Sequence, residues 1–166
     1  MSPPLVTYLN NHLAGSVLAI ELVEHAIDRD KGTPLESLYS RLLPEIQSDQ
    51  NVLRELIEAL DARESRAKKA AAWLGEKISR LKRDGGNDEE KASLIRMEEI
   101  EMLGLGIFGK RALWIVLQAL AGRDARLNIV KYDLLIARAD EQLNLVESFR
   151  LDLAKDVLLE APRERS

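Results

Sequence analysis

Four side chains in this sequence are of types that bind metal ions or share protons, and each interrupts an otherwise apolar helical stripe. They are His12, Asp49, Glu101 and Gln142. An imidazole, two carboxylates and an amide that meet in an apolar interior can hold a metal ion through nitrogen and oxygen ligands. The same groups can instead satisfy one another in a hydrogen-bonded network, since buried polar groups need partners. The residue types alone fit both kinds of site.

These side chains can meet only if long helices bring them to one level. Apolar residues recur at intervals of three and four along almost the whole chain, and no segment alternates at period two, so the predicted fold is all-helical. Thr33-Pro34-Leu35-Glu36 has the spacing of a capping box, and glycines mark several helix ends. The predicted helices cover about 5–28, 34–62, 64–83, 89–121 and 125–160, with a frayed tail at 162–166.

Apolar stripes on the four longer helices predict a four-helix bundle. The shorter helix, 64–83, can carry the chain ~30 Å back along the bundle at ~1.5 Å per residue, so it is expected to be a crossover that makes its two neighbours parallel. On the helix at 89–121 the stripe predicted to face the core is Leu94, Met97, Glu101, Leu105, Phe108, Ala112 and Ile115.

The register of the hairpins predicts which polar residues meet. If the first turn pivots near residues 30 and 31, His12 faces Asp49. Glu101 lies at nearly the height of Asp49, and Gln142 lies within one turn of the position opposite Glu101. Ser16 and Glu45 follow one turn away. The expected buried polar cluster is therefore His12, Asp49, Glu101, Gln142, Glu45 and Ser16.

Two helical hairpins, a long crossover and inward polar residues at mid-height together resemble the ferritin-like family over nearly the whole chain. Family members with a di-iron or di-manganese centre take a Glu from each of two helices and Glu-x-x-His from each of the other two. By position, Glu45 or Asp49 and Glu101 would match such carboxylates, while His12 and Gln142 stand where further ligands would be. The sequence has no Glu-x-x-His, so a complete di-metal site is not expected.

The resemblance and the missing motif lead to two functional hypotheses. The first is a non-catalytic ferritin-like protein that acts through self-assembly or partner binding, with no catalytic residue, no cofactor and a structural polar layer. The alternative is an oxidoreductase with a reduced site, in which His12, Asp49 and Glu101 hold one Fe, Mn or Zn ion. Whether the protein is an enzyme stays open. We expect a homo-oligomer, a dimer, and the residues of the last helix that lie off its core stripe support this: Leu127, Leu134, Leu145 and Leu151.

The run Gly104–Lys110 matches the dinucleotide fingerprint G-x-G-x-x-G. That motif holds phosphate only between a strand and a helix, where backbone amides are free. Here the run lies in mid-helix with its amides already bonded. The glycines are expected to allow a close approach by another helix or a local bulge.

Composition narrows the remaining classes. The 166 residues fit one domain, 1–166, and the net charge of −4 does not favour nucleic acid as a partner. The chain has no cysteine, no secretory leader and no apolar run of the ~20 residues that cross a bilayer, so we expect a cytoplasmic protein without a membrane partner. The basic segment from Arg63 to Arg83 is expected to pair with the acidic stretch that follows it.

Overall fold

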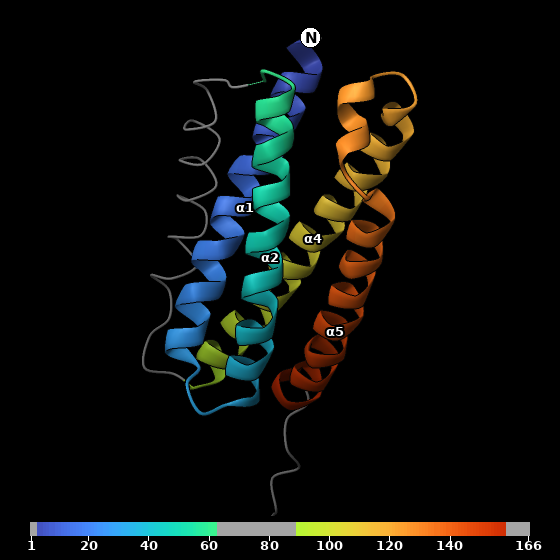
Figure 1. Ribbon diagram of the computed structural model, residues 1–166. Coiled ribbons are helices and arrows are strands. Elements are labelled where there is room, and N and C mark those ends of the chain that lie inside the picture. Colours follow the sequence, from blue (N-terminus) through green and yellow to red (C-terminus); the bar gives the residue numbers. More distant parts are fainter. Residues whose placement is uncertain (1–2, 63–88, 159–166) are drawn as a thin grey trace, which may run out of the picture.

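Two antiparallel helical hairpins make up the computed structural model, which describes residues 3–62 and 89–158 (Figure 1). Helices α1 (Pro3–Arg29) and α2 (Pro34–Ala59) form one hairpin, and α4 (Glu89–Ala121) and α5 (Tyr132–Leu158) form the other. Helices α2 and α4 run in the same direction (Figure 1). The described chain is all-helical, as predicted. The predicted crossover helix at 64–83 and the tail at 162–166 lie outside the described residues.

The connection between α1 and α2 does not form the predicted capping box, because Glu36 bonds the amide of Gly32 rather than that of the N-cap residue Thr33. Gly32 takes a φ of +80°, a left-handed conformation that glycine adopts without strain. The carboxylate of Glu36 accepts a hydrogen bond from the Gly32 amide at 2.7 Å. The Thr33 hydroxyl does not cap α2 and donates to the carbonyl of Asp30 at 2.7 Å. The turn is thus tied to both helices that it joins.

Helix α2 ends at Ala59, three residues before the predicted boundary. Asp61 has a positive φ of 50°, and its amide donates to the carbonyl of Glu58 at 3.0 Å. The Ala62 amide reaches back to the carbonyl of Ile57 at 2.8 Å. These two bonds form the Schellman arrangement that satisfies the last carbonyls of a helix.

The last helix does not start at residue 125 as predicted. A 3-10 helix, Ala125–Ile129, comes first, and the extended backbone of Val130 separates it from α5. Leu127 is buried, and its carbonyl accepts a hydrogen bond from the Tyr132 hydroxyl at 2.9 Å. This contact folds the connection onto the start of α5, which a continuous helix could not do.

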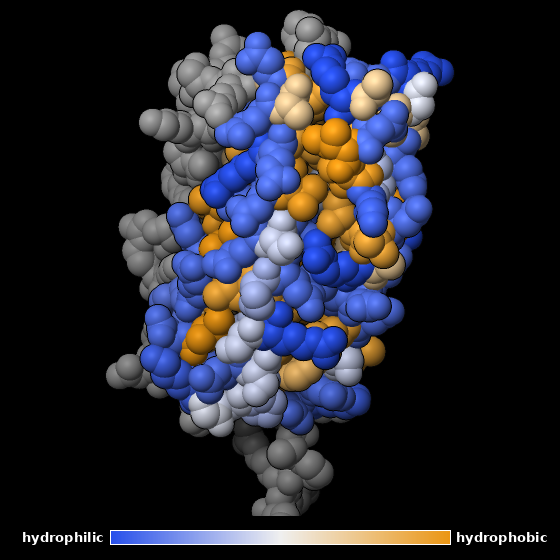
Figure 2. Space-filling view, viewed as in Figure 1, coloured by the Kyte–Doolittle hydropathy of each residue, from blue (hydrophilic) through white to orange (hydrophobic). Residues whose placement is uncertain are grey.

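The core consists of two clusters of buried apolar side chains, one toward each end of the bundle. The first includes Ile46 of α2 and Ile107 of α4, and the second includes Leu53 and Leu113 of the same helices. Between these two clusters, the inward-facing positions of α2 and α4 are occupied by Asp49 and Lys110. A polar layer therefore lies between the two clusters. On the face seen in Figure 2, apolar residues reach the surface between the upper parts of α2 and α5.

The face that α4 turns inward differs from the predicted stripe. Of that stripe only Met97 is buried, while Leu105 is 72% exposed and Phe108 is 60% exposed. The pattern misled because α4 is apolar on two faces, and spacing alone does not say which one faces the core. The apolar residues that α4 buries are Met97, Ile100, Leu103, Ile107, Leu113, Trp114 and Leu117, and it also buries Glu99.

Within the described ranges, no helix combines the length and the apolar character that crossing a membrane requires.

Candidate functional site

Asp49 is the centre of the polar layer, and its side chain is 2% exposed. One carboxylate oxygen accepts a hydrogen bond from the Lys110 ammonium of α4 at 2.5 Å. The other accepts from the Arg138 guanidinium of α5. Two cations from different helices thus compensate one buried carboxylate, which is the condition for burying such a charge.

Gln142 extends this layer along α5. Its amide oxygen accepts from the Lys110 ammonium at 2.5 Å, and its amide nitrogen donates to the Glu45 carboxylate at 2.8 Å. The structure therefore brings three of the six predicted cluster residues, Asp49, Gln142 and Glu45, into one network. Arg138 and Lys110 complete it.

His12 and Ser16 lie on α1 beside this network. The Ser16 hydroxyl accepts a hydrogen bond from the Gln50 amide at 2.9 Å and donates to the carbonyl of Leu13 at 2.7 Å. The His12 ring packs edge-on against Tyr8, with ring centroids 4.6 Å apart. Burial lowers the pKa of His12, so its imidazole is neutral at pH 7. The described residues contain no hydrogen bond between His12 and Asp49.

Glu101 does not join the layer. Its side chain is 43% exposed, and it accepts a hydrogen bond from the Arg150 guanidinium of α5 at 3.3 Å. It belongs to the outward stripe of α4, on the opposite side of this helix from Lys110. The three ligands of the single-metal hypothesis, His12, Asp49 and Glu101, are therefore not brought together. Among the described residues no group of three His, Cys, Asp or Glu side chains is placed to hold a metal ion.

Sequence reasoning missed Lys110 as the α4 member of the layer. A signal was present, because Lys110 continues the inward series Leu103, Ile107 and Trp114 at intervals of three and four. Burial lowers the pKa of Lys110 and the Arg138 charge adds to this effect, whereas the Asp49 carboxylate opposes it.

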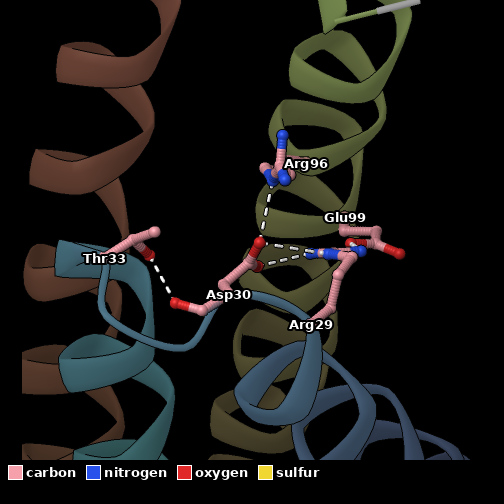
Figure 3. A network of polar contacts seen from close by, with 5 residues as sticks. All are labelled: Arg29, Asp30, Thr33, Arg96 and Glu99. Atoms are coloured by element: carbon pink, nitrogen blue, oxygen red, sulfur yellow. Dashed lines mark hydrogen bonds and ion pairs between the residues drawn. The ribbon is translucent and has the colours of Figure 1, made fainter. Parts of the chain in front are cut away.

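A second charged cluster joins the first hairpin to α4 (Figure 3). Asp30, whose side chain is 1% exposed, accepts hydrogen bonds from Arg29 at 2.6 and 3.2 Å and from Arg96 at 2.8 Å. Arg29 also donates to Glu99 at 2.5 Å. Burial by itself would raise the pKa of Asp30, but the hydrogen bonds and charges of the two arginines outweigh it and hold that pKa below its ordinary value.

A cavity of about 440 Å³ lies among α1, α2 and α4. Its lining is mainly apolar, but it includes His12, Asp49 and Lys110 of the layer region. Three glycines also line it: Gly15 of α1, and Gly106 and Gly109 of α4. Pockets of this size with a few convergent polar groups are typical of small-molecule sites.

The outer face of α4 is a second candidate, defined here as Leu94, Leu105, Phe108, Ala112, Ile115 and Val116. These residues follow one another at helical spacing. Five of them are large and exposed, with Leu94 at 40%, Ile115 at 39% and Val116 at 41% beside the two named above. The residues from Leu105 to Val116 form one apolar patch, while the exposed Glu101 on the same face separates Leu94 from it. Apolar patches of this kind often mark interaction sites on proteins.

No protein family, curated protein or solved structure matches this chain.

Proposed function

We propose that the protein is a non-catalytic, ferritin-like helical bundle that acts by associating with a second copy of itself through the outer face of α4. The observation that carries the proposal is the exposure of five large apolar side chains in one stripe. Together they expose on the order of 400 Å² of apolar area, which is the size of the largest apolar patch on a typical protein, and such patches are often functional.

The spacing of the stripe favours a second copy as the occupant. Leu94 and Val116 each lie eleven residues from Leu105, on either side of it. A twofold axis through Leu105 sets the Leu94 end of one α4 against the Val116 end of the other. The same patch then serves both copies, as twofold interfaces require. The contact would run for ~33 Å of helix at ~1.5 Å per residue.

The borders of the stripe suit an interface rim. Arg111 of α4 pairs with Asp140 of α5 at 2.5 Å, and Arg150 pairs with Glu147 at 2.7 Å and with Glu101. These ion pairs are partly exposed and already satisfied within the chain. Association would therefore place apolar side chains at the centre and paired charges at the edge, the usual anatomy of protein interfaces.

The predicted interface on the last helix has less support. Leu127 is buried, and Leu145 packs against the core. Leu134 and Leu151 are exposed, at 65% and 47%. Leu134 thus provides a control, because it is as exposed as the residues of the outer face of α4 without belonging to it.

Sedimentation velocity over a wide range of protein concentration tests the proposal. We expect wild-type protein to dimerise, and Leu105→Lys with Phe108→Lys to shift it to monomer by placing two charges at the centre of the contact. Leu134→Lys should leave the dimer intact. A wild-type monomer at all concentrations, or a dimer that only Leu134→Lys disrupts, would overturn the proposal.

A further inference from the structure

The cavity among α1, α2 and α4 lies apart from the outer face of α4, and none of the residues of that face line it. We infer that it is a binding site for a small, neutral, mainly apolar molecule with a carbonyl-type oxygen at one end. Three features lead to this ligand class: glycines in the cavity wall, unused hydrogen-bond donors beside it, and the charge balance of the polar layer.

Glycines from two helices line the cavity: Gly15 of α1, and Gly106 and Gly109 of α4. Glycine inside a helix is unfavourable by roughly 1 kcal/mol relative to alanine. None of the three has a positive φ, and a Cβ added to any of them would meet nothing within 4 Å. Neither backbone conformation nor close packing by the described residues explains them. Their effect is to keep the wall of the cavity open.

Unused hydrogen-bond donors lie beside the cavity. The Lys110 ammonium has three N–H groups, of which Asp49 and Gln142 take two. The indole nitrogen of Trp114 also has no partner, but it is fully buried and does not open on the cavity. Neutral His12 provides one further N–H. A molecule that fits here supplies an acceptor.

The charge of the layer excludes an anionic head group. Lys110 and Arg138 contribute two positive charges, and Asp49 and Glu45 contribute two carboxylates. An added carboxylate would be an uncompensated charge in a largely apolar cavity, which is costly. A ketone, aldehyde or amide oxygen accepts the free N–H groups without adding charge. The volume of about 440 Å³ lies within the range of small-molecule pockets.

Calorimetric titration of the full-length protein tests this with 2-decanone as the probe, and with decanoate and decane as comparisons. We expect saturable binding of 2-decanone at one site per chain, and binding of both comparison compounds weaker by about tenfold or more. Such a difference equals one hydrogen bond to a charged donor for decane, or one uncompensated charge for decanoate. Equal binding of decane and 2-decanone, or preferred binding of decanoate, would contradict the inferred chemistry.

Variants locate the site. Gly109→Leu should fill the cavity and weaken 2-decanone binding at least tenfold while the helix stays folded, because leucine is a better helix former than glycine. Gly104→Ala is the matched control on the same helix. Its Cβ would make an ordinary contact of 3.5 Å with Val146, outside the cavity, and binding should not change.

His12→Phe removes the His12 N–H beside the cavity but keeps an aromatic ring, and should weaken binding by about three- to tenfold. No binding of 2-decanone by wild-type protein would overturn the inference. So would undiminished binding to Gly109→Leu. Loss of dimerisation in the α4 variants above would not bear on either result, since the ligand is bound within one chain.

Discussion

Two buried aspartates of this protein, Asp30 and Asp49, carry the same chemistry in different surroundings. Each is almost fully buried, and each accepts hydrogen bonds from two cationic side chains. Around Asp30 the hydrogen bonds form a closed cluster. Arg29 also donates to Glu99, and the backbone carbonyl of Asp30 accepts from the Thr33 hydroxyl. Asp49 lies instead at a cavity, beside the Lys110 ammonium, of whose three N–H groups two are used.

The comparison distinguishes a cluster that stabilises the fold, around Asp30, from a candidate binding site, around Asp49. A buried carboxylate with two cations stabilises a fold wherever it occurs, so the cluster alone does not indicate function. Both regions contain a buried polar atom without a partner, since the Tyr39 hydroxyl near the Asp30 cluster has none either. What distinguishes the Asp49 region is the unfilled volume beside it, whereas the role of the Asp30 region is to fix the α1–α2 turn to α4.

The largest expected effect is the loss of stability in Asp49→Ala. This change leaves the Lys110 ammonium, whose side chain is 15% exposed, without its carboxylate, while the Arg138 guanidinium, at 30% exposed, can be solvated by water. Uncompensated buried charge of this kind typically costs about 3–5 kcal/mol. Urea unfolding followed by circular dichroism measures it.

Asp30→Ala should cost less, about 1.5–3 kcal/mol. Arg29 keeps its bond to Glu99, and the side chains of Arg29 and Arg96 are 25% and 30% exposed, so water can solvate them. Equal losses in the two variants would show that the closed and open surroundings do not differ energetically.

The next effect is a pH dependence carried by Asp30. Its pKa in the folded protein is held below the ordinary value of 3.8. Protonation therefore favours the unfolded chain, and the stability that Asp30 contributes is fully present above pH 4 and is lost as the pH falls through the folded pKa. Wild-type protein should thus lose more unfolding free energy between pH 5 and pH 3 than Asp30→Asn does. Parallel pH profiles for the two proteins would rule out this role.

The polar layer shows which part of the candidate site could be predicted from the sequence. Hairpin register, counted from the first turn and from the helix starts, predicts that Asp49 and Gln142 lie at one level, and the structure places them in one network. Register along a helix follows from residue counts, because the rise per residue is constant. The rotation of α4 did not follow in the same way, because its outward stripe is as apolar as its inward one. The pattern therefore predicts Glu101 in the polar layer, where the structure has Lys110 instead.

The 3-10 helix before α5 shows a different limit. Its position depends on a tertiary hydrogen bond, from the Tyr132 hydroxyl to the carbonyl of Leu127, and on the burial of Leu127. The helical periodicity of the sequence continues through this segment, so local pattern predicts one uninterrupted helix. Packing then overrides the local preference, as it often does at the ends of helices.

The smallest predicted effect contrasts a glycine near each aspartate. Gly32, in the turn after Asp30, has a φ of +80°, so Gly32→Ala should lower stability by about 1 kcal/mol. Gly109, in the cavity wall near Asp49, has no such conformation and no close neighbour, so Gly109→Ala should raise stability by about 0.5–1 kcal/mol. Thermal unfolding of the two variants gives the signs directly. A loss of stability in Gly109→Ala would mean that a close backbone contact, rather than an open cavity, requires the glycine. Opposite signs would show that one glycine serves the fold and the other preserves a space that the fold does not need.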